Sequence, residues 1–265
     1  RPARVAARAR VHAGGMPVLV GTSGWQYDDW RGVLYPAGLP RREWLAYYFT
    51  RFRTVEVNAT FYRLPTAQVV AGWAAAAPQD AVIAVKASRF LTHVRRLAEP
   101  AEPVARMESV LAPLGHRLGP VLLQLPPTLP AAPAALEQTL TRFPPGRRVA
   151  VEPRHASWFT PQIREILCSH DAALVWADRR NRPTGPLWRT ASWGFVRLHE
   201  GTASPAPSYG PAALRSWSAR IRGQWSADED VYVYFNNDAN AAAVRNASTF
   251  ARLTARAGWP VSRTP

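Results

Sequence analysis

The chain has 265 residues, of which 47% are hydrophobic and 19% are charged. This composition supplies enough apolar material for a sizeable core and excludes a disordered polyelectrolyte. Cys168 is the only cysteine, which excludes an intramolecular disulfide and a cysteine-rich zinc site. No apolar run approaches the roughly 20 residues that span a bilayer, and no signal-like apolar segment follows the Arg-bearing start. We therefore expect a soluble, cytoplasmic protein with no membrane partner.

The formal net charge of +15 favours acidic partners, either an anionic small molecule or a nucleic acid. Lys86 is the only lysine among the 33 basic residues, and the chain is also rich in Ala and Pro. Codon usage in a GC-rich genome produces the same pattern. The charge alone therefore leaves specific nucleic-acid binding and a generally basic surface as equal alternatives, and the oligomeric state stays open.

Residues 1–13 alternate Arg with Ala and Val and carry no helix cap, so we predict a disordered basic tail before a single domain over 14–265. Within this domain, eight short apolar runs alternate with longer helical or loop segments. The predicted strands are 17–22, 54–58, 81–86, 120–125, 148–152, 172–177, 195–199 and 231–236. The predicted helices are 41–52, 66–77, 103–114, 131–143, 161–170, 211–222 and 238–257.

Several predicted helix ends have a local chemical reason. Thr66 and Thr160 can accept hydrogen bonds from the first amide groups of a helix, and Pro161 and Pro211 suit a first helical turn. Gly258 suits a helix stop. These signals place the helices between the predicted strands.

Eight such units favour a single (β/α)8 TIM-like barrel over an open doubly wound sheet, which remains the alternative fold. In a barrel the carboxyl ends of the strands meet at one face, so the polar residues there are predicted to converge. These residues are Glu56, Asn58, Lys86, Gln124, Glu152, Arg154, His155, Asp178, Arg197, His199 and Asn236. Strand alternation places Val57, Leu198 and Phe235 on the opposite side, toward the helices. The alternative for each polar residue is a structural network or a helix cap.

Lys86 is the most suggestive single residue, because the chain uses Arg for every other positive charge. An amine can change its protonation state or form a Schiff base, whereas the guanidinium of Arg does not lose its proton. We favour an electrostatic or proton-transfer role over a salt bridge of Lys86 with Glu56 or Glu152.

His93, His155 and His199 follow predicted strands and, with Glu56, Glu152 and Asp178, could bind a divalent metal. No compact metal-binding spacing such as His-Glu-x-x-His is present, so we predict neither a metal nor another cofactor. Arg154 and Arg197 could clamp a phosphate or carboxylate, with a structural salt bridge as the alternative. Trp25 and Tyr62 could stack on a base or sugar, with loop packing as the alternative.

Eight stretches of this chain together resemble the YecE-like family, a domain of unknown function. They are GTSGWQYDDWRGVLYP, TVEVNATFYRLP, KASRFLTH, LLQLPP, VEPRHASW, VWAD, VRLH and YFNND, and they span about residues 18–250. The resemblance implies a TIM-like barrel. It puts the site on Trp25, Glu56, Asn58, Tyr62, Lys86, His93, Gln124, Glu152, Arg154, His155, Asp178, Arg197, His199 and Asn236. Pro153 departs from the aromatic residue expected in the family's E-x-R-H segment. The resemblance supplies no reaction, and the likeness of such barrels to endonuclease-IV-type repair enzymes is an analogy of fold.

The first functional hypothesis is a metal-independent hydrolase or lyase that acts on a phosphate-bearing anion, such as a nucleotide or nucleic acid. Glu152 or Glu56 would be the general acid or base, Lys86 and Arg197 would stabilise negative charge, and His93 or His199 would assist proton transfer. The second is a Schiff-base lyase or aldolase that uses Lys86 on a small sugar or keto acid. The third is a non-catalytic nucleic-acid-binding protein that uses surface arginines.

Overall fold

The computed structural model describes residues 18–263, so the predicted basic tail at 1–13 lies outside the described residues. The strands are β1 (Val18–Thr22), β2 (Thr54–Val57), β3 (Val82–Lys86), β4 (Leu118–Gln124), β5 (Val149–Glu152), β6 (Ala173–Leu174), β7 (Trp176–Arg179), β8 (Arg182–Pro183), β9 (Gly194–Leu198) and β10 (Val231–Phe235). The α-helices are α1 (Trp44–Arg51), α2 (Ala59–Tyr62), α3 (Ala67–Ala76), α4 (Ala101–Leu111), α5 (Pro133–Leu140), α6 (Pro161–Ser169), α7 (Pro211–Arg222) and α8 (Ala242–Arg256). Short turns of 3₁₀-helix are η1 (Asp28–Trp30), η2 (Arg41–Glu43), η4 (Ala112–Arg117), η5 (Ala156–Trp158) and η6 (Ala239–Ala241), and η3 (Phe90–Val94) is a π-helical turn.

The predicted helix ends are confirmed where their chemistry was specified. The Thr66 side chain accepts a hydrogen bond from the amide of Val69, and Thr160 accepts one from the amide of Ile163. Gly258, with a φ of +81°, lies just beyond the last turn of α8, in the left-handed region that glycine adopts most readily. Within residues 18–263 we find no helix that is both long and apolar enough to span a membrane.

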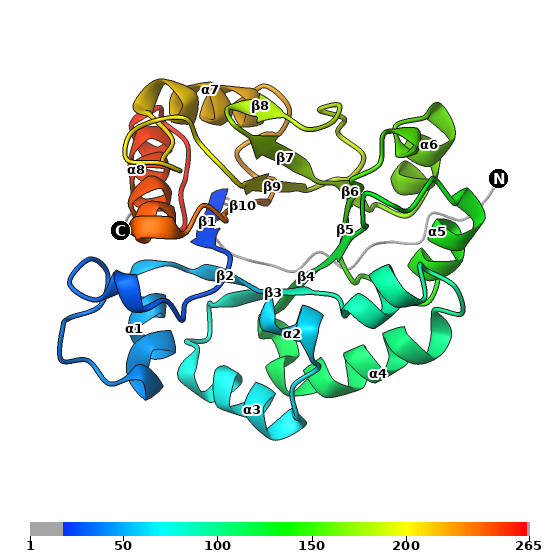
Figure 1. Cartoon of the computed structure of the whole chain (residues 1–265), viewed down its shortest axis with the longest axis horizontal. Coiled ribbons are helices and arrows are strands. Elements are labelled where there is room, and N and C mark those ends of the chain that lie inside the picture. The colour runs from blue at the N-terminus through cyan, green and yellow to red at the C-terminus, as the bar shows by residue number, and fades with distance from the viewer. Residues whose placement is uncertain (1–17, 264–265) are drawn as a thin grey trace.

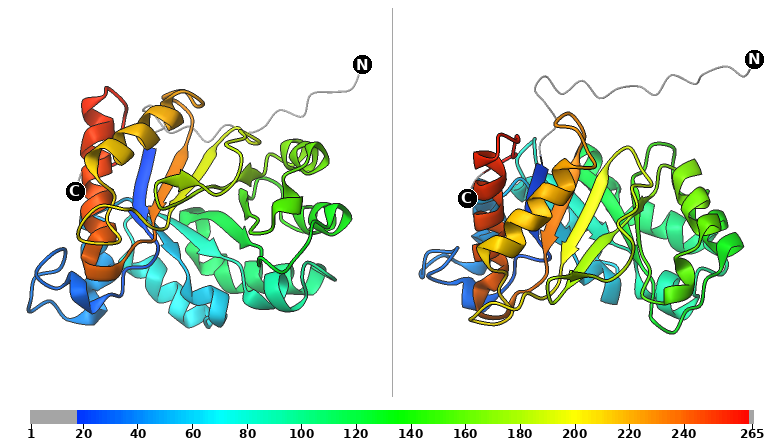
Figure 2. Two further views of the ribbon diagram at one scale, coloured as in Figure 1. Left: turned by 45° about the horizontal axis from the view of Figure 1, so that its top comes forward. Right: turned by 90° about the horizontal axis from the view of Figure 1, so that it is seen from above.

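The strands form two five-stranded sheets, in the orders β1-β10-β9-β7-β8 and β2-β3-β4-β5-β6. Their neighbouring strands are parallel, except for the antiparallel pair β7 and β8. Figure 1 and Figure 2 show the helices arranged outside the strands. The predicted mixed α/β architecture with parallel strands is thus confirmed.

Within residues 18–263 the predicted closed barrel is not found, because the strand ladder is interrupted. The strand predicted at 172–177 divides at Val175, so that β6 pairs with β5 whereas β7 pairs with β9. At the other junction, β1 and β2 are joined by an isolated bridge between Ser23 and Glu56 rather than by a ladder. A Cβ at Gly21 would lie 2.1 Å from the carbonyl oxygen of Thr54, so only glycine allows the two strands to approach this closely.

Alternation along the strands separates two groups of buried side chains. One group faces the helices and includes Val57, Leu198 and Phe235, as predicted. The other comes from both sheets and packs them against each other; its members include Leu19, Ala84, Leu122, Ala150, Ala173, Phe195, Tyr232 and Tyr234. We call the strand face that carries this second group the inner face.

Candidate functional site

The inner face changes from apolar to polar at the carboxyl ends of the strands. The polar residues lie two positions beyond the preceding inner-face residue on their strands, so alternation aims them to the same side. They are Glu56 beyond Thr54, Lys86 beyond Ala84, Gln124 beyond Leu122, Glu152 beyond Ala150, Arg197 beyond Phe195 and Asn236 beyond Tyr234. This alternation is the reason that these residues are predicted to converge.

Arg197 links the two sheets through two buried carboxylates. Its Nη2 donates to Oε1 of Glu56 at 2.8 Å, and its Nη1 donates to Oε2 of Glu152 at 2.5 Å. The three residues are at most 1% exposed. Since removing one partner of a buried ion pair leaves a charge without compensation, each member depends on the other two. Both terminal nitrogens of Arg197 are engaged, so Arg197 positions the carboxylates rather than offering a clamp to a ligand.

Glu152 is also bound by Arg154 and His199. Arg154 Nη2 donates to Oε1 of Glu152 at 2.7 Å, and Nε2 of His199 lies 2.9 Å from the same oxygen. Asn236 Nδ2 lies 3.0 Å from Nδ1 of His199. A neutral imidazole with its proton on Nε2 satisfies all of these contacts, because Nε2 then donates to Glu152 while Nδ1 accepts from Asn236.

The pKa values of this group follow from burial and charge. Burial raises the pKa of Glu152, but the charge of Arg197, the hydrogen bond from His199 and the charge of Arg154 together hold it well below its usual range. Burial lowers the pKa of His199, and the attraction of Glu152 does not fully reverse this effect. At neutral pH we therefore expect an ionised Glu152 beside a neutral His199, and Glu152 is a poor proton acceptor.

Glu56, Glu152, Arg154, Arg197 and His199 form what we call the ionic cluster. Lys86 lies near this cluster but forms no ion pair with it. Its Nζ lies 4.0 Å from the ring centre of Phe61, in the geometry of a cation–π contact. Within residues 18–263 the ammonium forms no hydrogen bond or salt bridge, so the alternative of an ion pair with Glu56 or Glu152 is not what the structure has. Burial and the charge of Arg197 lower the pKa of Lys86 to about 8, although Glu56 and Glu152 oppose the shift.

His93 of η3 and Tyr62 at the end of α2 both contact Phe61, the ring beside Lys86. The His93 ring meets Phe61 edge to face at 4.9 Å, and its Nδ1 lies 2.9 Å from Oγ1 of Thr92. Burial and the nearby Lys86 lower the pKa of His93. Tyr62 also meets Phe61 edge to face but is 74% exposed, so its ring faces solvent beside the site.

Three predicted site residues lie elsewhere or have other contacts. Asp178 follows Trp176 on the outer face of β7, where its carboxylate accepts hydrogen bonds from Tyr209 and Trp217 of the α7 region; its predicted place in the site is corrected accordingly. Burial raises the pKa of Asp178 despite these bonds. His155 accepts a hydrogen bond from the amide of Ser157 and caps η5. Trp25 is 6% exposed and packs edge to face on Trp73, which matches the loop-packing alternative.

Two contacts at the site were not predicted from the sequence. Ser23 Oγ donates to Oε1 of Glu56 at 2.7 Å, so the loop after β1 helps to hold this carboxylate. Phe61, rather than its neighbour Tyr62, contacts Lys86. The motif that contains Tyr62 also contains Phe61, and the α2 turn determines which of the two rings faces the lysine.

The donor set does not suit a metal ion. Within residues 18–263 no group of three or more His, Cys, Asp or Glu side chains is placed to bind one. Glu56 and Glu152 are bridged by Arg197, which occupies the position a cation would take between them. The predicted metal-site alternative of three histidines with acidic residues is therefore not assembled in this part of the chain.

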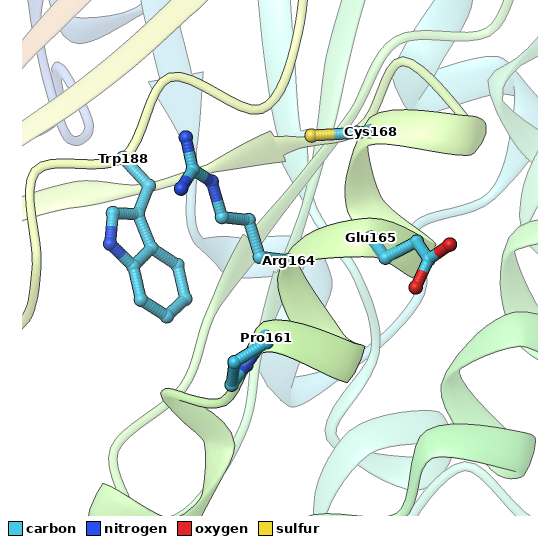
Figure 3. A pocket seen from close by; sticks show the side chains of 5 residues that line it. All are labelled: Pro161, Arg164, Glu165, Cys168 and Trp188. Atoms are coloured by element: carbon cyan, nitrogen blue, oxygen red, sulfur yellow. The ribbon is translucent and has the colours of Figure 1, made fainter.

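A cavity of about 360 Å³ lies away from this cluster, on the outer surface of α6. It is lined by Pro161, Arg164, Glu165, Cys168 and Trp188. Figure 3 shows the Arg164 side chain beside the Trp188 ring and Glu165 directed away from it. None of these residues belongs to the inner face, so the ionic cluster and this cavity are separate features.

Comparison with known proteins places the chain in a family. The family model described as "Protein of unknown function DUF72" matches residues 19–265. The chain is 24% identical to the UPF0759 protein YunF of Bacillus subtilis (strain 168), in a match that covers 89% of this chain and 94% of that protein. It is 29% identical to the UPF0759 protein YecE of Escherichia coli (strain K12) over 143 residues, which cover 54% of this chain and 50% of that protein.

Solved structures agree with this placement. A DUF72 family protein from Thermotoga maritima matches with a TM-score of 0.78 and 28% identity, over 89% of this chain and 98% of that chain. SacUVDE matches with a TM-score of 0.56 and 6% identity, over 91% of this chain and 99% of that chain, which shows a shared fold alone. The resemblance inferred from the sequence motifs is confirmed, and the chain belongs to the DUF72 family.

Proposed function

We propose that this chain is an enzyme that acts on an anionic, phosphate-bearing substrate held at the carboxyl ends of the inner-face strands, and that Lys86 is the group that meets the anion. The observation that carries the proposal is the half-buried Lys86 ammonium, which has no hydrogen-bond or ion-pair partner within residues 18–263. Removing a cation from water without a partner is costly, so a retained one indicates a role that a ligand completes.

The charges around Lys86 support an anion as that ligand. Lys86, Arg154 and Arg197 supply three positive charges, and Glu56 and Glu152 supply two negative charges. Since the pKa of His199 is lowered by burial, this residue adds no full charge at neutral pH. The group therefore carries one excess positive charge, and the excess lies beside its one unpaired cation, Lys86.

Lys86 is also the best proton-transfer group in the cluster. With a pKa of about 8, its amine exchanges a proton close to neutral pH, which is where general acid–base catalysis is efficient. Glu152 stays ionised, so its contribution is to hold Arg197, Arg154 and His199 in place. His93 also contacts Phe61 and is the second candidate for proton transfer.

A phosphate titration tests the anion site. Isothermal titration calorimetry with inorganic phosphate at neutral pH and low salt should detect binding to the native protein and a loss of about tenfold or more in Lys86→Met. Arg95→Met is the matched control, because Arg95 pairs with Glu99 on the surface. Equal phosphate affinity in the native protein and in Lys86→Met would overturn the proposal.

The phosphate-bearing substrate class includes nucleotides and nucleic acids, which the same assay distinguishes. A nucleoside monophosphate and a short single-stranded oligonucleotide are titrated beside inorganic phosphate, and hydrolysis is followed with bis(4-nitrophenyl) phosphate without added metal. Binding that requires Lys86 supports the pocket. Oligonucleotide binding that weakens steeply with salt and is unchanged in Lys86→Met would instead favour the non-catalytic surface interaction.

The lowered pKa of Lys86 favours one second candidate, a Schiff-base lyase or aldolase. The neutral amine would attack a substrate carbonyl carbon, and loss of water from the carbinolamine would give an iminium. Borohydride would then transfer a hydride to the iminium carbon and fix the adduct. Peptide mass spectrometry after incubation with small sugars and keto acids should locate the adduct on Lys86; the absence of any adduct across the panel would exclude this candidate.

A further inference from the structure

Within residues 18–263, polar side chains at the carboxyl ends of β2 and β4 lack hydrogen-bond partners. Oδ1 of Asn58 is buried and unpaired, and the amide of Gln124 forms no hydrogen bond with any residue in the part of the chain that the structure describes. Oε2 of Glu56 is likewise buried without a donor. Buried polar groups are nearly always paired in native proteins, so two such oxygens two residues apart, on Glu56 and Asn58, indicate that something outside the chain completes them.

The fold brings these groups to one side of the site. Gln124 ends β4 opposite Glu152 in the ladder, and it lies two residues beyond Leu122, the register partner of Lys86. Asn58 directly follows β2 and stands two residues beyond Glu56. Thr60 of the adjoining α2 donates a hydrogen bond to the backbone oxygen of Lys86 at 2.7 Å, which ties this segment to the end of β3.

The chemistry of the unpaired groups specifies the missing partner. Lys86 can only donate, whereas Oδ1 of Asn58 and Oε2 of Glu56 can only accept; the amide of Gln124 does both. A fully ionised phosphate supplies acceptors alone and would leave the oxygens of Asn58 and Glu56 without donors. Hydroxyl groups both donate and accept, so a molecule with several hydroxyls beside an anionic group satisfies these four groups.

The rings beside Lys86 fit the same kind of ligand. Phe61 covers the ammonium, and the adjoining Tyr62 presents its ring to solvent. Ligand sites commonly combine such apolar surfaces with a few placed polar groups, and the carbon-bound hydrogens of a sugar can pack on an aromatic face while its hydroxyls reach the amides.

We infer that the substrate is a sugar phosphate, whose phosphate meets Lys86 and whose hydroxyl groups bind Asn58, Gln124 and Oε2 of Glu56. This inference rests on the proposed anion site at Lys86 and adds the hydroxyl-binding half. It assigns to Asn58 and Gln124 the recognition of the sugar, with no part in binding the phosphate.

Two matched probes separate the two halves. D-Glucitol 6-phosphate carries a chain of hydroxyls and no carbonyl, whereas propyl phosphate carries the same anionic group without hydroxyls. Calorimetry on the full chain should show that glucitol 6-phosphate binds about tenfold or more tightly than propyl phosphate. Asn58→Ala and Gln124→Met should remove that advantage, and Lys86→Met should weaken both probes.

The possible failures are distinct. If the two probes bind equally to the native protein, or if Asn58→Ala and Gln124→Met keep the preference for glucitol 6-phosphate, the sugar inference is overturned while the anion site stands. If neither probe binds, the proposed function fails and the inference fails with it. Circular dichroism and thermal melting of each variant establish that a lost preference does not arise from unfolding.

Discussion

The Lys86 ammonium lies 4.0 Å from the ring centre of Phe61, and within residues 18–263 no carboxylate pairs with it. Burial and the charge of Arg197 lower the pKa of Lys86, so the aromatic face does not fully replace the water that the ammonium has lost. The native fold therefore keeps this charge at a cost in stability.

We predict that Lys86→Met is more stable than the native protein at neutral pH. Burial lowers the pKa of Lys86 from 10.5 to about 8, so the folded state binds this proton more weakly than the unfolded chain. The penalty is fully present below about pH 8 and is relieved as pH rises toward 10.5. Removing it should add on the order of 1–3 kcal/mol at pH 7, and the difference between the two proteins should shrink with rising pH.

Urea unfolding followed by tryptophan fluorescence at a series of pH values measures this difference. Comparing the two proteins cancels the titration of the tyrosines that they share. A Lys86→Met protein that is less stable than the native one at pH 7 would mean that the lysine serves the fold rather than a ligand.

Arg197→Met should be among the most damaging substitutions in the chain. It leaves Glu56 and Glu152 buried without their shared cation, and breaking a buried ion pair in this way typically costs about 3–5 kcal/mol. Arg95→Met is the matched control, because Glu99 is 78% exposed and such surface pairs contribute less than about 1 kcal/mol. Chemical unfolding of both variants checks the contrast, and a similar small loss in the two would refute the structural role of Arg197.

His199 should make the protein less stable in mild acid. Burial lowers the pKa of His199, so below about pH 6.5 the unfolded chain takes up a proton that the folded state resists, and the free energy of unfolding falls with pH. His199→Gln should remove up to about 1.4 kcal/mol per pH unit from this dependence between pH 6.5 and 5. Between pH 6.5 and 5 the carboxyl of Glu152 in the unfolded chain, with a pKa of 4.5, contributes little to this dependence.

A proton NMR titration of the His199 ring provides the direct check on this prediction. His93, whose pKa is also lowered, remains in the variant and accounts for part of the dependence that is left. An unchanged pH dependence of stability in His199→Gln would contradict the assignment of a buried neutral imidazole.

Asp178→Asn should separate stability from binding. The carboxylate accepts hydrogen bonds from Tyr209 and Trp217, and an amide nitrogen in place of one oxygen would face a donor. We expect a loss of about 1–3 kcal/mol in the free energy of unfolding. Phosphate binding at Lys86 should be unchanged, because Asp178 lies on the outer face of β7; a change in phosphate affinity measured by calorimetry would return this residue to the site.

The sequence predicted the strands and helices well because their signals are local. Apolar runs marked the strands, and Thr66, Thr160 and Gly258 marked helix ends by chemistry that involves only a few neighbouring residues. The closed barrel failed because closure depends on the path of the backbone. The strand predicted at 172–177 is divided at Val175 between the two sheets, and the residue pattern does not predict this division.

The site residues that lie on strands were predictable from strand alternation. Alternation correctly grouped Glu56, Lys86, Glu152 and Arg197, and it would also have excluded Asp178, since Ala177 rather than Asp178 continues the inner face. The partners within the group were not predictable. Glu152 has four basic residues nearby, and only the folded geometry decides which of them, Lys86, has no ion pair within residues 18–263.

The pairing of β1 with β10 has a consequence for how the protein forms. Val18 lies opposite Val231, so the first described strand pairs with β10 only after the chain has been synthesised as far as Val231. The ion pair of Glu56 with Arg197 likewise joins residues 141 positions apart, so the Glu56 carboxylate stays hydrated until Arg197 of β9 reaches it. Contacts of such long sequence separation slow folding, because the entropy of closing the loop is lost before any contact compensates for it. The ionic cluster therefore forms late, and its assembly reports that the two sheets have joined.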